Sequence, residues 1–163
     1  MSESTPNETV VVSTVISVAP ELAFEIFTDD VDVWWKRGPR FRSPDDAVMR
    51  FEPGPSGRLV ADDARGGTRE IGQVLAWEPD AGRLVFEFRA TNFTPDEVTE
   101  VEVLFEPVEG GTRVTLEHRG LDVLRRDHPA RHGLEGAALV SLYGLWWADL
   151  LIGVRERTPA TGR

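Results

Sequence analysis

Residues 139–156 read LVSLYGLWWADLLIGVRE, the most apolar stretch of a chain of 163 residues. On a helical wheel its large apolar side chains fall on one stripe and its polar side chains on the other side, which predicts an amphipathic helix. We expect this helix to run from about residue 133 to 157, roughly 36 Å at 1.5 Å per residue. The stripe consists of Val140, Tyr143, Gly144, Trp147, Leu150, Leu151 and Val154, and Ser141, Asp149 and Glu156 lie on the far side.

The segment from residue 40 to 118 supplies the surface that such a helix would cover. Turn sequences rich in Gly, Pro and Asp divide it into about six short strands, for example EPGPSGR at 52–58 and EPDAG at 78–82. These residue types favour tight reversals, so the segment predicts one antiparallel meander. Alternation within the strands places one set of side chains on a common, mostly apolar face, namely Leu84, Phe86, Phe88, Val101, Val103, Phe105, Val114, Leu116 and His118.

Residues 9–35 predict one strand and two short helices. TVVVSTVISV at 9–18 is a β-branched run that ends before Pro20, and proline suits the first turn of a helix. Apolar contacts of the two helices are expected from Leu22, Phe24, Ile26, Phe27, Val33, Trp34 and Trp35. The predicted fold class is therefore α+β, a curved antiparallel sheet of about seven strands covered by a long C-terminal helix, with two short helices after strand one.

The composition favours one soluble domain. Hydrophobic residues make up 40% of the chain and charged residues 28%, a balance typical of globular proteins. The formal net charge of -10 opposes binding to nucleic acid or to an anionic membrane, because both need clustered Lys or Arg. We therefore expect neither as a partner. The absence of cysteine excludes disulfides and thiolate chemistry and fits a reducing compartment.

The two ends of the chain bear on location and domain boundaries. MSESTPNETVVV at the N-terminus is acidic and polar where a signal peptide would be basic and then apolar, so the expected location is cytoplasmic. We expect residues 1–8 to be disordered, 9–157 to form a single domain and 158–163 to be a disordered tail. Residues 136–154 could instead span a bilayer, but Asp149 would cost about 2.5 to 3.5 kcal/mol there.

Several motifs, in the order in which they occur, resemble one protein family. VISVAPELAFEIFTD at 15–29 is similar to the opening of the SRPBCC (START-like) superfamily, in the branch named for activators of heat-shock protein 90 ATPase. GQVLAWEPDAGRLVFEF at 72–88 and GGTRVTLEHRGL at 110–121 resemble later strands of that branch. Trp146 stands where the family has glycine, so the closing motif is only approximated.

This resemblance implies a helix-grip fold, with a hydrophobic cavity between the sheet and the long helix. The first functional hypothesis is a binding protein for a lipophilic or aromatic small molecule, without catalysis of its own. The second, from the family name, is a co-chaperone that activates the heat-shock protein 90 ATPase, although the chain has room for the helix-grip domain alone. The third is an enzyme of cyclase or hydrolase type, for which the sequence offers no convincing acid–base pair. Both a monomer and a homodimer remain open.

The candidate ligand-binding residues lie mainly on the predicted apolar face and on the helix that covers it. Aromatic rings offer large contact areas and a phenol or imidazole can orient a ligand, although the same rings could fill a solid core. The set is Trp34, Phe41, Glu70, Phe86, Phe88, Val103, Phe105, His118, Tyr143, Trp147 and Leu151. No catalytic residue, metal ligand or cofactor is predicted.

The histidines have competing interpretations. His118 can orient a ligand or shuttle a proton, or it can be hydrogen bonded to a neighbour within the core. In the segment HPARHGLE, the spacing of His128, His132 and Glu135 is that of three zinc ligands on one face of a helix. Its proline and glycine make a continuous helix doubtful, so a surface loop is the favoured interpretation.

The orientation of one pair of neighbouring charged residues also leaves two alternatives. Arg69 and Glu70 begin a predicted strand, and alternation must point one of them inward. A buried charge without a partner is costly, so an inward Glu70 would be paired or part of a site. Both orientations stay open at this point.

Overall fold

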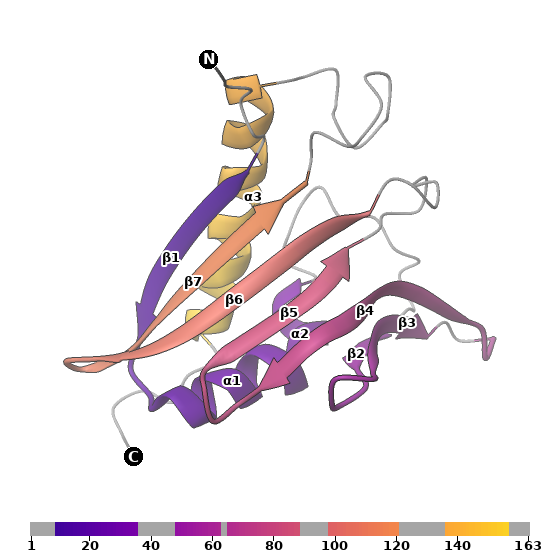
Figure 1. Cartoon of the computed structure of the whole chain (residues 1–163), viewed down its shortest axis with the longest axis horizontal. Helices are drawn as coiled ribbons and strands as arrows, with labels where there is room; N and C mark the ends of the chain where they lie inside the picture. The colour runs from indigo at the N-terminus through magenta and orange to yellow at the C-terminus, as the bar shows by residue number, and fades with distance from the viewer. Residues whose placement is uncertain (1–8, 36–47, 63–64, 89–97, 121–135, 157–163) are drawn as a thin grey trace.

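The chain folds into one curved antiparallel sheet with helices on its inner side (Figure 1). The computed structural model describes residues 9–35, 48–62, 65–88, 98–120 and 136–156. In chain order the elements are β1 (Val10–Ile16), α1 (Pro20–Asp29), α2 (Val31–Trp35), β2 (Val48–Phe51), β3 (Arg58–Asp62), β4 (Thr68–Glu78), β5 (Arg83–Phe88), β6 (Thr99–Val108), β7 (Gly111–Arg119) and α3 (Gly136–Glu156). Phe41 and the predicted tails at 1–8 and 158–163 lie outside the described residues.

The strand order is β1-β7-β6-β5-β4-β3-β2, and every neighbouring pair is antiparallel. Strands β2 to β7 form the predicted meander, and β1 returns to pair with the last strand, so that Val10 lies opposite His118. The α+β helix-grip fold predicted from the sequence is thereby confirmed.

Two irregularities bend the sheet at β4. The register shifts between Leu59 and Val60 in the β3–β4 pair, and again between Val74 and Ala76 in the β4–β5 pair. Such bulges increase local twist and bend a strand. Gly72 lies between them, and a Cβ at this position would collide with the carbonyl oxygen of Glu87. The missing side chain thus permits the close approach of β4 and β5.

Helix α3 lies along the inner side of the sheet and packs against β1 and α2. Five residues of its predicted stripe are buried, namely Tyr143, Trp147, Leu150, Leu151 and Val154. Its length and composition would also suit a membrane span, but 44% of that window is buried within the protein. The packing against the sheet accounts for the apolar sequence as that of a core helix.

Only some of the apolar side chains of the two short helices are buried. Phe24, Ile26, Phe27 and Trp34 are buried, whereas Leu22 and Val33 are 39% and 48% exposed. Leu22 and Val33 therefore do not belong to the buried core.

The outer face of the sheet is charged, as alternation predicts. In its centre Arg83 Nε donates to Glu102 Oε2 at 2.8 Å, and Arg119 Nη1 donates to Glu102 Oε1 at 3.0 Å. The hydrogen bond from Arg83 holds the pKa of the Glu102 carboxyl below its ordinary value. The apolar side chains of these strands consequently face α3.

The two ends of the sheet differ. At the hairpin end, marked by Gly82 and Gly110, β4 turns into β5 and β6 into β7. At the loop end, marked by Phe88 and Arg119 and lying at the upper right of Figure 1, β5 and β7 end and the chain continues into residues outside the described ranges. Helix α1 lies at the hairpin end. The carbonyl of Val18, just before α1, accepts a hydrogen bond of 2.7 Å from Thr112 Oγ1 at the start of β7.

Candidate functional site

Five rings meet on the inner face at the loop end, and we call them the loop-end cluster: Phe88 of β5, His118 of β7, and Tyr143, Trp146 and Trp147 of α3. The ring centroids of Phe88 and His118 are 5.5 Å apart, those of His118 and Tyr143 5.7 Å, and those of Trp146 and Trp147 4.8 Å. Residues three and four apart share one side of a helix, which is why α3 contributes three rings. The five rings together form an aromatic layer between the sheet and α3.

His118 is the centre of a hydrogen-bond chain through this cluster. Trp147 Nε1 donates to His118 Nδ1 at 3.0 Å, and His118 Nε2 lies 2.8 Å from Thr99 Oγ1. The Thr99 hydroxyl donates to the carbonyl of Phe88 at 2.8 Å, so its oxygen accepts from His118. The chain fixes the Nε2–H tautomer and ties α3 to β7, β6 and β5.

Burial also fixes the charge of His118. Its side chain has no exposed surface. Because desolvation penalises the charged imidazolium, burial lowers the pKa of His118 to about 3. A neutral imidazole with both nitrogens engaged is the hydrogen-bonded core histidine of the two sequence interpretations, and it does not take up a second proton near neutral pH.

A second aromatic group closes the hairpin end. Phe24 of α1 lies 5.2 Å from Trp77 and 5.3 Å from Phe105 between ring centroids, and Phe27 lies 4.6 Å from Trp34. Trp34 Nε1 donates to the carbonyl of Phe27 at 3.0 Å. Helices α1 and α2 thereby fill the inner face at this end.

The residues proposed from the sequence are divided between these regions. Phe88, His118, Tyr143 and Trp147 are together in the loop-end cluster, and Trp34, Phe86 and Phe105 belong to the aromatic packing nearer the hairpin end. Val103 and Leu151 are buried in the same core. Phe41, His128, His132 and Glu135 lie outside the described residues.

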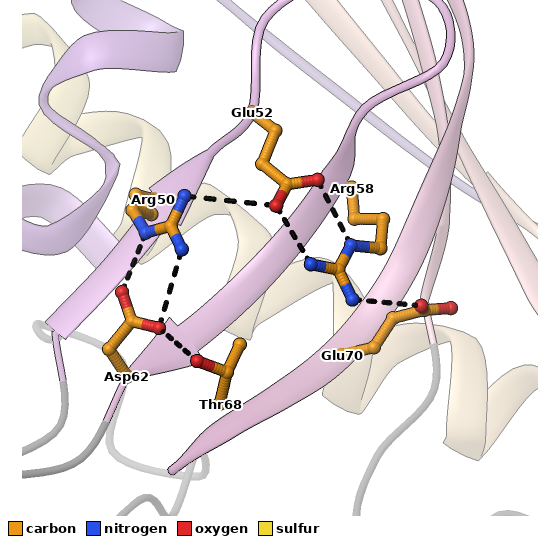
Figure 2. A network of polar contacts seen from close by, with 6 residues as sticks. All are labelled: Arg50, Glu52, Arg58, Asp62, Thr68 and Glu70. Atoms are coloured by element: carbon orange, nitrogen blue, oxygen red, sulfur yellow. Dashed lines mark hydrogen bonds and ion pairs between the residues drawn. The ribbon is translucent and has the colours of Figure 1, made fainter. Parts of the chain in front are cut away.

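Glu70 lies on the outer face, in a polar network over β2, β3 and β4 (Figure 2). It is 3.7 Å from Arg58 Nη1, and Arg58 in turn donates to both carboxylate oxygens of Glu52. The hydrogen bond from Arg58 holds the pKa of the Glu52 carboxyl below its ordinary value. Further along, Arg50 Nε donates to Asp62 Oδ2 at 2.6 Å. Glu70 therefore points outward, where it pairs with Arg58, and it does not face the inner side of the sheet.

Arg69 is the residue that points inward. It pairs with Ala61 in the β3–β4 ladder, and Ala61 pairs with Met49, both of them buried core residues. Paired residues of an antiparallel ladder share a face. Arg69 is half-buried, and burial lowers the pKa of its guanidinium.

The sequence did not identify three residues that matter for the inner face of the sheet. Trp146 is only 6% exposed although it lies beside the predicted stripe, because the rings of Phe88, Tyr143 and Trp147 pack around it. Thr99 carried no signal at all, since its importance comes from His118, 19 residues away. Arg69 was recognisable only as one of two alternatives.

Metal binding finds no support in the part of the chain that the structure describes. No group of three or more His, Asp or Glu side chains there could hold a metal ion. The HPARHGLE motif lies outside that part and stays untested.

The family described as "Activator of Hsp90 ATPase homolog 1-like protein" matches residues 17–143. This segment begins just before α1 and ends within α3, at a residue of the loop-end cluster. A search of curated protein sequences found no significant match.

Solved structures share the fold at low sequence identity. A crystal structure of a Thermus thermophilus protein is similar with a TM-score of 0.63 and 22% identity, covering 91% of this chain and 95% of that one. An HSP90 activator from Plasmodium falciparum gives 0.61 and 16%, with coverages of 91% and 94%. The Aha1 dimer from Colwellia psychrerythraea gives 0.59 and 18%, with coverages of 91% and 93%.

Proposed function

Because this chain belongs to the activator of Hsp90 ATPase homolog 1-like family, we propose that it uses the family's fold to bind a small lipophilic or aromatic molecule. The ligand binds between α3 and the loop end of the sheet, in the cytoplasm, without a cofactor and without chemistry of its own. One observation carries the proposal: the loop-end cluster is aromatic, and its imidazole is already saturated by intramolecular hydrogen bonds.

The exposed fractions of the aromatic side chains favour the loop end over the hairpin end as the place where a ligand binds. Tyr143 and Trp146 keep 7% and 6% of their surface exposed, while His118 and Trp147 behind them keep none. At the hairpin end α1 and α2 occupy the inner face with their own aromatic side chains. A ligand therefore has rings to contact at the loop end without displacing a helix.

Catalysis by general acid–base chemistry is disfavoured at the same place. A proton shuttle works best with a pKa near the working pH, and His118 has a pKa of about 3. The described acidic residues with resolved pKa shifts, Glu52, Asp62 and Glu102, lie on the outer face with arginine partners. A cyclase or hydrolase would need groups other than these.

The test is a titration with 2-acetylnaphthalene, an uncharged two-ring probe, followed by amide and indole N–H shifts in NMR spectra. Shifts are expected for Phe88, Tyr143 and Trp146. Trp146→Phe should weaken binding about fivefold, as expected for the loss of some tens of Å² of contact at about 25 cal/mol per Å². Trp77→Phe is the matched control, because it removes one indole near the hairpin end. Equal effects of both variants, or no shift in the wild type, would refute the proposal.

Activation of the Hsp90 ATPase is the second candidate function. It is supported by the family's description and by the similar fold of the Plasmodium falciparum activator. Chaperone pull-down and ATPase assays separate the two functions. Charge reversals on the outer face, such as Arg83→Glu, should abolish activation and leave probe binding intact. Trp146→Phe should leave activation intact and weaken probe binding about fivefold. The dimeric Colwellia psychrerythraea relative makes a homodimer the form to examine first.

A further inference from the structure

Arg69 is a cation on the apolar side of the sheet. Its ladder partner Ala61 is 5% exposed, and Met49, one strand further, is 3% exposed. Ile71, two residues along the same strand, is fully buried in the core cluster. The Arg69 side chain therefore leaves β4 on the apolar face of the sheet.

Four other arginines of the sheet are arranged differently. Arg50, Arg58, Arg83 and Arg119 each contact at least one carboxylate on the outer face, and Arg113 of β7 is exposed to solvent. Among the residues that the structure describes, no carboxylate forms a hydrogen bond or ion pair with the Arg69 side chain. Desolvation without a counter-charge is costly, and an incoming anion would relieve that cost.

We propose that Arg69 is the anion anchor of the ligand site, so that the natural ligand is an apolar or aromatic carboxylate. This inference rests on the proposed binding function and narrows its ligand class. A guanidinium presents a rigid fork of donors that matches both oxygens of a carboxylate, which makes Arg more selective for this group than Lys.

The distance from Arg69 to the loop-end cluster suits such a ligand. Gly72 lies three residues along β4 and approaches the backbone of Glu87, the neighbour of Phe88. At about 3.3 Å per residue, the path along β4 is about 10 Å. The Arg69 side chain and a two-ring aromatic acid span this length together, with the carboxylate at Arg69 and the rings toward Phe88.

The test compares naphthalene-2-carboxylate with 2-acetylnaphthalene, which has the same rings and no charge. The wild type is expected to bind the carboxylate at least tenfold more tightly, in line with a charge-assisted hydrogen bond. Arg69→Gln should remove this preference and leave the affinity for 2-acetylnaphthalene unchanged, and Arg69→Lys should restore only part of it. Arg113→Gln is the matched control, since Arg113 lies on the exposed outer side of β7.

A second readout separates an anchor from a structural arginine. Because no carboxylate of the described residues pairs with Arg69, Arg69→Gln should not lower the melting temperature without ligand, whereas Arg58→Gln, which removes the contacts to Glu52 and Glu70, should lower it. A fall as large as that of Arg58→Gln would overturn the inference, as would equal wild-type affinity for the two probes. If both probes bind equally, the binding site stands and the anion anchor fails; if neither binds, both proposals fail.

Discussion

The neutral state of His118 makes folding stability depend on pH in a defined direction. The imidazole has an ordinary pKa of 6.5, and burial lowers the pKa to about 3 in the folded protein. Below pH 6.5 the unfolded chain therefore takes up a proton that the folded protein refuses. Stability contributed by neutral His118 is present above pH 6.5 and is lost progressively as the pH falls toward 3.

The size of the effect follows from the two pKa values. Each pKa unit corresponds to about 1.4 kcal/mol, so between pH 6.0 and 4.5 the loss is about 2 kcal/mol. This is a large part of the total for a protein whose free energy of unfolding is typically about 5 to 15 kcal/mol. The window lies above the pH at which the paired carboxyls of Glu52, Asp62 and Glu102 lose their charge, because their arginine partners lower those pKa values.

Urea titrations at several pH values, with wild type and His118→Gln, isolate this contribution. Glutamine does not titrate, and the remaining ionisable groups are common to both proteins, so they cancel in the difference. The wild-type free energy of unfolding should fall relative to the variant by about 1.4 kcal/mol per pH unit. Parallel curves across the window would mean that folded His118 accepts a proton at its ordinary pKa, and the buried hydrogen-bond chain would then be wrong.

Three substitutions, two of them with a matched control variant, test the packing by denaturant titration. Trp147→Ala should lower the free energy of unfolding by about 3 to 5 kcal/mol because the indole is buried. Leu145→Ala, at a side chain 74% exposed, should lower it by less than about 0.5 kcal/mol. Similar losses in the two variants would mean that α3 does not pack against the sheet through Trp147. Thr99→Val keeps the side-chain shape but removes the acceptor of His118 Nε2–H, and a loss of about 1 to 3 kcal/mol is expected. Gly72→Ala should destabilise far more than Gln73→Ala, because only its Cβ meets the carbonyl oxygen of Glu87.

Much of the fold was predictable because its signals are local. Turn sequences separate the strands, period-two alternation marks their inner faces, and the helical period of α3 identifies Tyr143, Trp147 and Leu151 as buried. The errors arise where burial depends on shape. Leu22 is 39% exposed although the next two residues of α1 are buried, and Trp146 is buried because the rings of Phe88, Tyr143 and Trp147 pack around it.

The direction of Arg69 and Glu70 depends on the pairing register. Thr68 lies opposite Asp62 and Arg69 opposite Ala61, which settles the face of each residue. The adjoining bulge at Leu59 and Val60 shifts the phase of β4, so alternation counted from the buried Ile71 and Val74 would not assign it reliably. Sequence spacing cannot supply a register that the partner strand imposes.

His118 shows why a residue type in a suitable place does not define a site. Its two partners, Thr99 and Trp147, come from other elements 19 and 29 residues away, and together they saturate both ring nitrogens. The imidazole that looked like the polar contact for a ligand therefore holds α3 on the sheet. The ligand that we propose therefore needs another polar partner. In our proposal this partner is Arg69, which leaves β4 on the inner face and has no carboxylate partner among the described residues.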